Sequence, residues 1–207
     1  MGERRLVVVA DDFGLTLETS RSIVRAHLDG VVTATSVMGN GRSTGRSMRF
    51  LAGAPTLEVG LHAVLVGEDP PLLSAPEIPT LVGHRGHLAS SWRTFVPRLV
   101  AGRVDPADIR LEIAAQLAFV RSGAGPVTHI NLHQHLHLWP TVRTTVLDLA
   151  GAEGIGYVRT PSSARPGPFG AAIRRLARAA AAEVASRGLA TSDGFLGLDE
   201  AGRWDSA

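Results

Sequence analysis

Strand-like and helix-like segments alternate along this chain, and this alternation constrains its fold more than any other feature. Short apolar or β-branched runs that are typical of strands occupy residues 6–10, 31–38, 57–64, 126–132 and 156–159. Segments with helical spacing or composition occupy residues 17–28, 45–52, 92–101, 106–121, 141–153 and 170–187. Strands joined by crossover helices build a parallel sheet covered by helices. The sequence therefore predicts an α/β fold.

The composition excludes several kinds of chemistry. The chain has 207 residues, 44% of them hydrophobic, which is enough for one domain, and we predict a single domain over residues 1–207. All 21 basic residues are arginines, so mechanisms that need a Schiff-base or P-loop lysine are excluded. There is no cysteine, so any metal must be bound by imidazole, carboxylate or water.

The charge and hydropathy patterns give expectations about location and partners. The sequence pI of about 10.2 accompanies a net charge of only +2, because almost nothing titrates between the histidines and the arginines. A nucleic-acid partner is therefore not expected. No run of 18 apolar residues and no signal-peptide pattern occurs, so we expect a cytoplasmic protein without a transmembrane segment. The sequence leaves a homodimer open.

Two clusters of metal-ligand residues follow predicted strands. Asp11 and Asp12 come directly after the first strand, and His133, His135 and His137 come after the fourth. Parallel α/β sheets place their active sites at these strand ends. Adjacent aspartates are explained equally well as the start of a turn. In an extended segment, however, neighbouring side chains point to opposite sides, so one aspartate can bind a metal while the other faces substrate.

The histidine cluster points to a metal more directly. If the segment stays extended, its three histidines share one face with His129 and Asn131. Protonated histidines crowded on one face would repel each other unless a metal or a carboxylate lies among them. A lone histidine such as His62 is more often structural than a ligand, but its position near the end of the third strand would let it complete a set of two imidazoles and one carboxylate. Such a set leaves coordination positions open for water and substrate, so the residues indicate metal-assisted hydrolysis.

Four stretches carry a family resemblance. They are Ala10-Asp11-Asp12-Phe13-Gly14-Leu15, Thr33-Ala34-Thr35-Ser36, Val59-Gly60-Leu61-His62, and Thr128 through His137 followed by Pro140. Together they resemble the YdjC-like carbohydrate deacetylases, which include chitooligosaccharide deacetylases and a hopanoid biosynthesis-associated branch. Residues 60–66, 76–79 and 158–161 favour that branch.

The resemblance implies a distorted (β/α) barrel of the polysaccharide-deacetylase-like type. The implied activity is metal-dependent removal of an N-acetyl group from an amino sugar, an oligosaccharide or a sugar-bearing hopanoid lipid. One divalent ion, magnesium or zinc, would be held by Asp12, His62 and His133. Asp11 would be the general base for the attacking water.

Four further residues receive weaker assignments. His135 and His137 are expected to support the metal ligands or to line the substrate face. Asn40 and Arg159 follow predicted strands and are candidates for the substrate side, although a structural role explains each equally well.

The chain departs from the family pattern at two places. Asn131 stands where many members have an aspartate, although asparagine is usual in the hopanoid-associated branch. Beyond residue 197 the family commonly continues to a strand with a histidine near the site, and no histidine follows here. We therefore expect a domain that lacks the family's last C-terminal strand. A metal-dependent phosphoesterase with two ions, and a catalytically weak metal- or sugar-binding remnant, are the alternatives.

Overall fold

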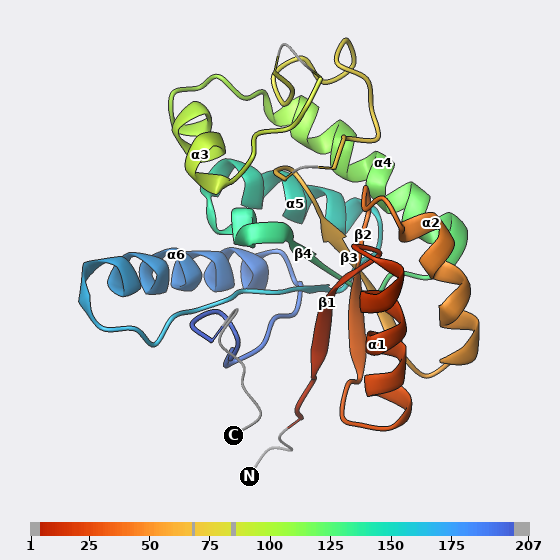
Figure 1. Cartoon of the computed structure of the whole chain (residues 1–207). Coiled ribbons are helices and arrows are strands. Elements are labelled where there is room, and N and C mark those ends of the chain that lie inside the picture. Colours follow the sequence, from red (N-terminus) through yellow and green to blue (C-terminus); the bar gives the residue numbers. More distant parts are fainter. Residues whose placement is uncertain (1–4, 68, 84–85, 201–207) are drawn as a thin grey trace.

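The protein is organised around a parallel sheet. A computed structural model describes residues 5–67, 69–83 and 86–200. Within these residues the sheet has five strands in consecutive order: β1 (Val9–Phe13), β2 (Ala34–Met38), β3 (Glu58–Ala63), β4 (His129–Leu132) and β5 (Tyr157–Val158) (Figure 1). Consecutive order is typical of (β/α) barrels, whereas doubly wound sheets reverse direction at a switch point. The predicted α/β fold is confirmed, and the sheet agrees with a distorted (β/α) barrel.

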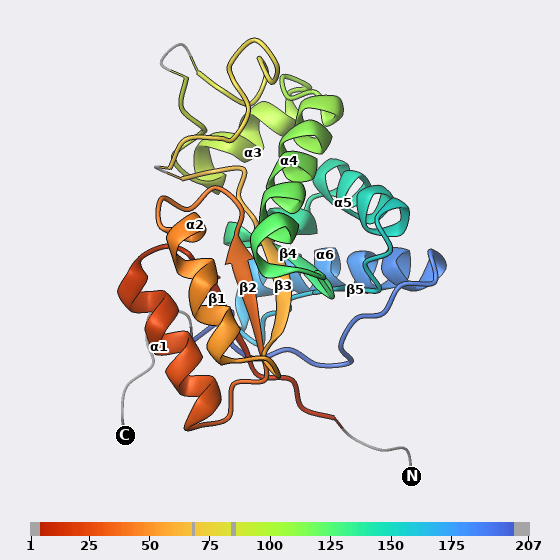
Figure 2. The same cartoon turned by 90° about the vertical axis from the view of Figure 1, so that its right-hand side faces the viewer.

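Helices connect these strands and pack around them (Figures 1 and 2). The described helices are α1 (Leu17–Leu28), α2 (Thr44–Ser47), α3 (Trp92–Val100), α4 (Pro106–Ala124), α5 (Pro140–Ala152) and α6 (Gly167–Ser186), with the 3-10 helices η1 (Met48–Gly53) and η2 (His133–Leu138). α1 contacts β1, α4 contacts β2 and β3, and α5 contacts β5. None of these helices combines the length and the apolarity needed to cross a bilayer.

One face of the sheet is apolar and forms the core. Its middle row runs across all five strands in register and is at most 1% exposed; the residues are Phe13, Val37, Leu61, Ile130 and Val158. The apolar stripe of α4 is buried in the same cluster: Ile109, Ile113, Leu117 and Val120. Burying each large aliphatic side chain contributes about 1.5–3 kcal/mol, so this face fixes how the helices dock.

The opposite face of the sheet is polar. Ser36, His62, His129 and Asn131 project from it and are at most 6% exposed. Gly60 makes room for the His129 ring, because a Cβ at position 60 would lie 2.2 Å from that ring. Buried polar groups are stable only when they are hydrogen-bonded, so this face must hold an ordered network.

The first strand begins later than predicted. Leu6 and Val7 are 82% and 59% exposed, and β1 begins at Val9, which is in register with Ala34 of β2. Pairing with β2, rather than the apolar run, therefore sets the start of the strand. Because of this shift, Asp11 and Asp12 lie inside β1 and not after it.

The described part of the long segment between β3 and α3 is irregular, but it is tied to α4. The buried Glu112 carboxylate accepts hydrogen bonds from the backbone N–H groups of Leu72 and Leu73, at 3.0 and 3.1 Å. Asp108 accepts from the backbone and the hydroxyl of Thr80. These side chains satisfy backbone groups that a sheet or helix would otherwise satisfy, so the segment has a defined path.

The sheet is extended beyond β5 by a single bridge. Ala190, after α6, accepts a hydrogen bond from the Val158 N–H at 3.0 Å and donates to the Gly156 carbonyl at 2.8 Å. At the other edge, β1 pairs with β2 alone within the described residues. The described sheet is therefore open.

Candidate active site

A β-bulge places two carboxylates on the same side of the sheet. Ala10 pairs with Thr35 and Phe13 with Val37, so Asp11 and Asp12 together oppose one residue of β2. Asp12 takes up the extra residue with a φ of +64°, a left-handed conformation that aspartate tolerates better than most side chains. The expectation that the two side chains point to opposite sides is wrong, because the bulge interrupts the alternation of the strand.

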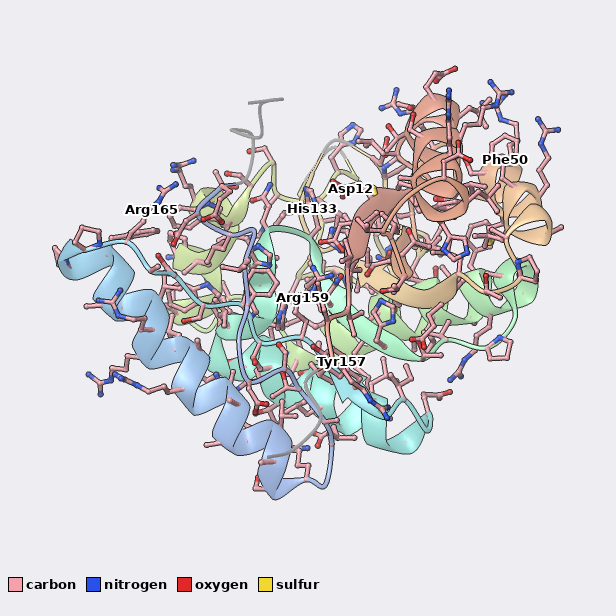
Figure 3. The ribbon with its side chains drawn as sticks, turned by 90° about the horizontal axis from the view of Figure 1, so that it is seen from below. Asp12, Phe50, His133, Tyr157, Arg159 and Arg165 are labelled. Atoms are coloured by element: carbon pink, nitrogen blue, oxygen red, sulfur yellow. The ribbon has the colours of Figure 1, made fainter. Side chains whose placement is uncertain are left out.

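Asp12, His62 and His133 come together as the resemblance implies. His62 Nε2 lies 3.3 Å and His133 Nδ1 lies 3.6 Å from Asp12 Oδ1, and the two ring nitrogens are 3.2 Å apart. The three residues come from β1, β3 and the start of η2, at the carboxyl end of the sheet. Figure 3 shows Asp12 and His133 facing the same region.

This arrangement fits a divalent cation. One ligand atom from each residue lies within 4.8 Å of the other two. Two ligands bound tetrahedrally at 2.0–2.1 Å are about 3.3 Å apart, which is close to the spacing of these atoms. Asp12 Oδ1 is buried and has no hydrogen-bond partner among the described residues, as expected of an atom that awaits a ligand.

Asn131 orients His62. Its side-chain oxygen accepts a hydrogen bond from His62 Nδ1, which leaves the Nε2 lone pair facing Asp12. Its amide nitrogen donates to Asp11 Oδ1 at 3.1 Å and to Ser36 Oγ at 2.9 Å. The amide therefore stands where the resemblance would place a carboxylate, and it also links His62 to Asp11.

The hydrogen bonds of Asn131 continue through Ser36 to His129, and each hydrogen bond in this chain has one donor and one acceptor. Ser36 Oγ is 3.1 Å from His129 Nε2, and His129 Nδ1 is 3.0 Å from Thr128 Oγ1. Because Thr128 donates to the Val59 carbonyl, His129 donates through Nδ1 and accepts through Nε2. Burial first, and then the Arg159 charge, lower the pKa of His129 to about 4, so the ring is neutral near pH 7.

Arg159 binds Asp11 with both terminal guanidinium nitrogens. Nη1 lies 2.5 Å from Oδ2 and Nη2 lies 2.9 Å from Oδ1. The arginine side chain is 6% exposed and the aspartate side chain 28%. Such a bidentate pair fixes both side chains in position. The structure thus places Arg159 beside the predicted base.

The charges of the site hold both aspartates in their ionised form. Burial opposes ionisation of Asp11, but the nearby His62 and Arg159 charges hold its pKa well below the ordinary range. His133 and then His62 do the same for the pKa of Asp12. Burial disfavours protonation of His62, yet the two aspartates raise its pKa above the ordinary value. A field that favours a proton on this ring also favours a cation in its place.

The histidine segment does not remain extended. β4 ends at Leu132, and Gln134 and His135 have φ values of +53° and +54°, so the shared face breaks after Asn131. Tertiary contacts hold this turn, since Gln134 Oε1 accepts a hydrogen bond from the Trp92 N–H at 2.8 Å. The predicted single face of five side chains is therefore wrong.

His137 is buried, whereas His135 is partly exposed. The His137 side chain is 1% exposed, and its two ring nitrogens have no partners among the described residues. Its pKa falls to about 3, through burial and then the His135 charge. Burial and then Arg159 lower the pKa of His135 to about 4. Both rings are therefore neutral near pH 7.

Asn40 follows β2 at the same end of the sheet. Its side-chain amide nitrogen donates a hydrogen bond to the Pro70 carbonyl at 3.1 Å, which leaves the side-chain oxygen free to accept another. That oxygen is buried without a partner among the described residues. An unpaired buried acceptor costs about 1–3 kcal/mol, which a donor from water or a ligand would recover.

Sequence reasoning missed two residues beside this site. Ser36 links Asn131 to His129, and its position two residues before the end of a predicted strand was the available signal. The Phe195 ring lies 5.7 Å from the Arg159 guanidinium carbon and 6.2 Å from the centre of the His135 ring. No local pattern connects Phe195 to residues so distant in sequence.

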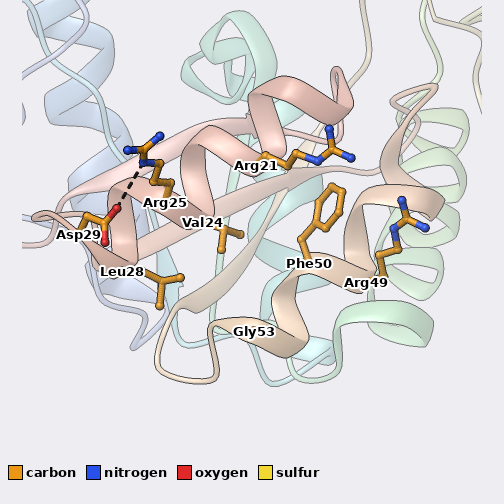
Figure 4. Close-up of a pocket in the computed structure, with 8 residues that line it drawn as sticks. All are labelled: Arg21, Val24, Arg25, Leu28, Asp29, Arg49, Phe50 and Gly53. Carbon is orange, nitrogen blue, oxygen red and sulfur yellow. Dashed lines mark hydrogen bonds and ion pairs between the residues drawn. The ribbon is translucent and has the colours of Figure 1, made fainter.

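A separate surface hollow lies between α1 and η1 (Figure 4). Arg21, Arg49 and Phe50 form one side of it, and both guanidinium groups lie 5.2 Å from the centre of the Phe50 ring. Figure 3 shows Phe50 well away from Asp12 and His133. This hollow is therefore not part of the candidate active site.

The fold and the site define a class of protein. It is an α/β chain of the barrel type, in which one aspartate and two histidines at the carboxyl ends of the strands are spaced to bind a divalent cation. The chain belongs to the YdjC-like protein family, whose pattern it matches over residues 5–207.

The chain is similar in sequence to relatives that are named as deacetylases. The chain is 35% identical to a human carbohydrate deacetylase, over 98% of the chain and 66% of that relative. It is 36% identical to a chitooligosaccharide deacetylase of Serratia marcescens, over 74% of the chain and 58% of that relative. The chain thus spans about two thirds or less of the length of these relatives.

A solved structure supports the fold alone. A crystal structure from Enterococcus faecalis V583, whose name provisionally assigns it to cellobiose-phosphate cleavage, superimposes with a TM-score of 0.70 at 23% identity. The match covers 91% of this chain and 66% of that one.

Proposed function

We propose that this protein is a metal-dependent carbohydrate deacetylase that hydrolyses the acetamide of an N-acetylated amino sugar. The observation that carries the proposal is the cluster of Asp12, His62 and His133 directly beside the ionised Asp11. The names of the human and Serratia relatives support the substrate class.

One divalent cation is proposed to occupy the cluster. A bound cation would lower the pKa of water and polarise the acyl carbonyl. Two imidazoles and one carboxylate suit zinc better than magnesium, which prefers oxygen ligands and water. Of the two candidate metals, zinc is therefore our first choice.

The hydrogen bonds of Asp11 suit it to act as a base. A carboxylate has about four acceptor positions. Three are used, because Oδ1 accepts from Arg159 and Asn131 and Oδ2 accepts from Arg159 once. The remaining position on Oδ2 is available to accept a proton from the attacking water. The two hydrogen bonds from Arg159 would hold the Asp11 carboxylate in a fixed orientation during this proton transfer.

The other candidate residues would contact or support the substrate. The unpaired oxygen of Asn40 would accept a hydrogen bond from a substrate hydroxyl or N–H group. His135, neutral and next to Arg159, would line the substrate side, whereas the buried His137 would support the turn beneath it.

The range of substrates includes simple and lipid-linked sugars. An N-acetylated oligosaccharide is the first candidate because the Serratia relative is named for chitooligosaccharides. A sugar-bearing hopanoid lipid is the second, and it rests on the sequence stretches that favour that branch.

Two other functions stay open. A phosphoesterase with two ions would need a second set of ligands, and the described residues gather one set, so this alternative is less well supported. A metal- or sugar-binding protein with weak catalysis would keep the same cluster.

Metal analysis combined with an acetate-release assay separates these functions. We expect about one zinc per chain, acetate release from N,N′-diacetylchitobiose, and loss of both after chelation. The Asp11→Asn variant serves as the matched control that keeps the metal ligands. Phosphate release without acetate release would support the phosphoesterase. Metal and sugar binding without either product would support the binding protein.

A further inference from the structure

We infer that Phe195, held against Arg159 and His135, is the platform on which the sugar ring of the substrate stacks. This inference deepens the proposed deacetylase function and rests on it. Phe195 belongs to the segment 190–200, which follows α6, whereas its two contacts lie after β5 and β4. The fold brings these three segments together beside the base Asp11.

The first observation is the position of the ring. The Arg159 guanidinium carbon lies 5.7 Å from the Phe195 ring centre, and the same guanidinium binds both oxygens of Asp11. Phe195 is thus separated from the proposed base by one side chain. Phe195 is partly exposed, so part of its surface can contact a ligand.

The second observation is that the segment carrying Phe195 is fixed at both ends. The Thr191 hydroxyl lies 2.7 Å from that of Thr160. Asp199 accepts hydrogen bonds from Ser163 Oγ at 2.7 Å and from the Ala164 N–H at 2.6 Å. The aromatic ring is therefore preorganised, and a ligand need not order it on binding.

The third observation is the polar atom next to the ring. His135 packs edge to face against Phe195, with ring centres 6.2 Å apart and an angle of 80° between the planes. Its Nδ1 atom is buried without a partner among the described residues. A flat apolar ring beside an unpaired polar atom suits a sugar, which has apolar C–H faces and hydroxyls around its edge.

The inference predicts different effects on two classes of acetamide. A sugar substrate would stack on Phe195, whereas 4-nitroacetanilide has no sugar ring and would use the base and the metal ligands alone. We expect Phe195→Ala to raise the KM for N,N′-diacetylchitobiose roughly tenfold, equivalent to about 1.4 kcal/mol, with little change in kcat. The KM for 4-nitroacetanilide should rise by much less than the KM for the sugar. Phe195→Trp should restore the KM for the sugar, and Phe195→Leu should not.

A neighbouring leucine provides the matched control. Leu196 is 86% exposed, so Leu196→Ala removes apolar surface from the same segment without touching Arg159 or His135. We expect this variant to keep the wild-type KM for the sugar. An equal rise in KM for Leu196→Ala and Phe195→Ala would overturn the inference.

Binding measurements keep this test separate from the test of catalysis. Calorimetric titration of N,N′-diacetylchitobiose into the Asp11→Asn variant, with and without Phe195→Ala, reports sugar binding without turnover. A tenfold larger dissociation constant for the double variant would support stacking of the sugar on Phe195, even if the wild type released no acetate. Equal dissociation constants, or equal losses with the sugar and with 4-nitroacetanilide, would overturn it.

Discussion

Asn131 connects the two halves of the proposed chemistry, so two substitutions there should have different effects. Its oxygen holds His62, and its nitrogen donates to Asp11. Asn131→Asp keeps an oxygen for His62 but places a second carboxylate oxygen where the donor to Asp11 had been. Asn131→Leu has a similar size and removes both contacts.

The structure sets the size of the Asn131→Asp effect. The new oxygen would lie 3.1 Å from Asp11 Oδ1, and two unit charges at that distance repel by about 5 kcal/mol at an effective dielectric constant of 20. Arg159, which contacts both Asp11 oxygens, offsets part of this repulsion. If a quarter remains, the acid limb of the kcat/KM profile moves to higher pH by about one unit. Metal content should stay at the wild-type level.

Asn131→Leu should act on the metal instead. Without an acceptor for Nδ1–H, His62 loses its fixed orientation, and such losses weaken metal binding about 10–100-fold. Leaving this buried donor unpaired also costs about 1–3 kcal/mol of stability.

Chelator competition and pH–rate profiles on the same preparations test both statements. If Asn131→Asp left the acid limb in place while it stayed folded and metal-loaded, Asp11 would not be the titrating base. Full metal affinity in Asn131→Leu would show that His62 does not depend on this contact.

Three further predictions concern the site and its surroundings. Asp11→Asn should keep the metal and lose turnover, whereas Asp12→Asn or His133→Ala should lose metal affinity. Metal analysis of the purified variants checks this prediction. The opposite pattern would reverse the assigned roles of Asp11 and Asp12. Saturating zinc at about 100 times its dissociation constant should stabilise the fold by about 2.7 kcal/mol in thermal denaturation, and Asp12→Asn should abolish that gain. His129 has an ordinary pKa of 6.5 in the unfolded chain and about 4 in the fold, so it contributes stability that is present above pH 6.5 and is lost as the pH falls towards 4. Chemical denaturation should show a loss of about 2 kcal/mol between pH 7 and pH 5 that is absent from His129→Gln, and an unchanged pH dependence in the variant would contradict the assignment.

Local sequence patterns predicted most elements well because their causes are local. α1 spans Leu17–Leu28 as predicted, and Thr16 caps it by accepting a hydrogen bond from the Thr19 N–H. The apolar stripe of α4 is buried as its period requires. The predicted start of the first strand failed because strand limits depend on the partner strand, which lies outside the local window.

The ligand set was assigned through the family resemblance, and it converges because parallel strands bring their carboxyl ends together. Asp12, His62 and His133 follow that rule and converge. The extended histidine face failed because the chain turns after Leu132 through two left-handed residues. That turn is held by Trp92, so only the assembled fold could place His135.

The sequence by itself determined the parallel α/β fold, the family and the set of candidate ligands, because these follow from periodicity and short motifs. The tertiary structure decided which polar groups satisfy one another. It oriented His62 through Asn131, bound Arg159 to Asp11, and brought Phe195 beside both Arg159 and His135. Each of these contacts joins residues on different elements, and no pattern along the chain records distances between elements.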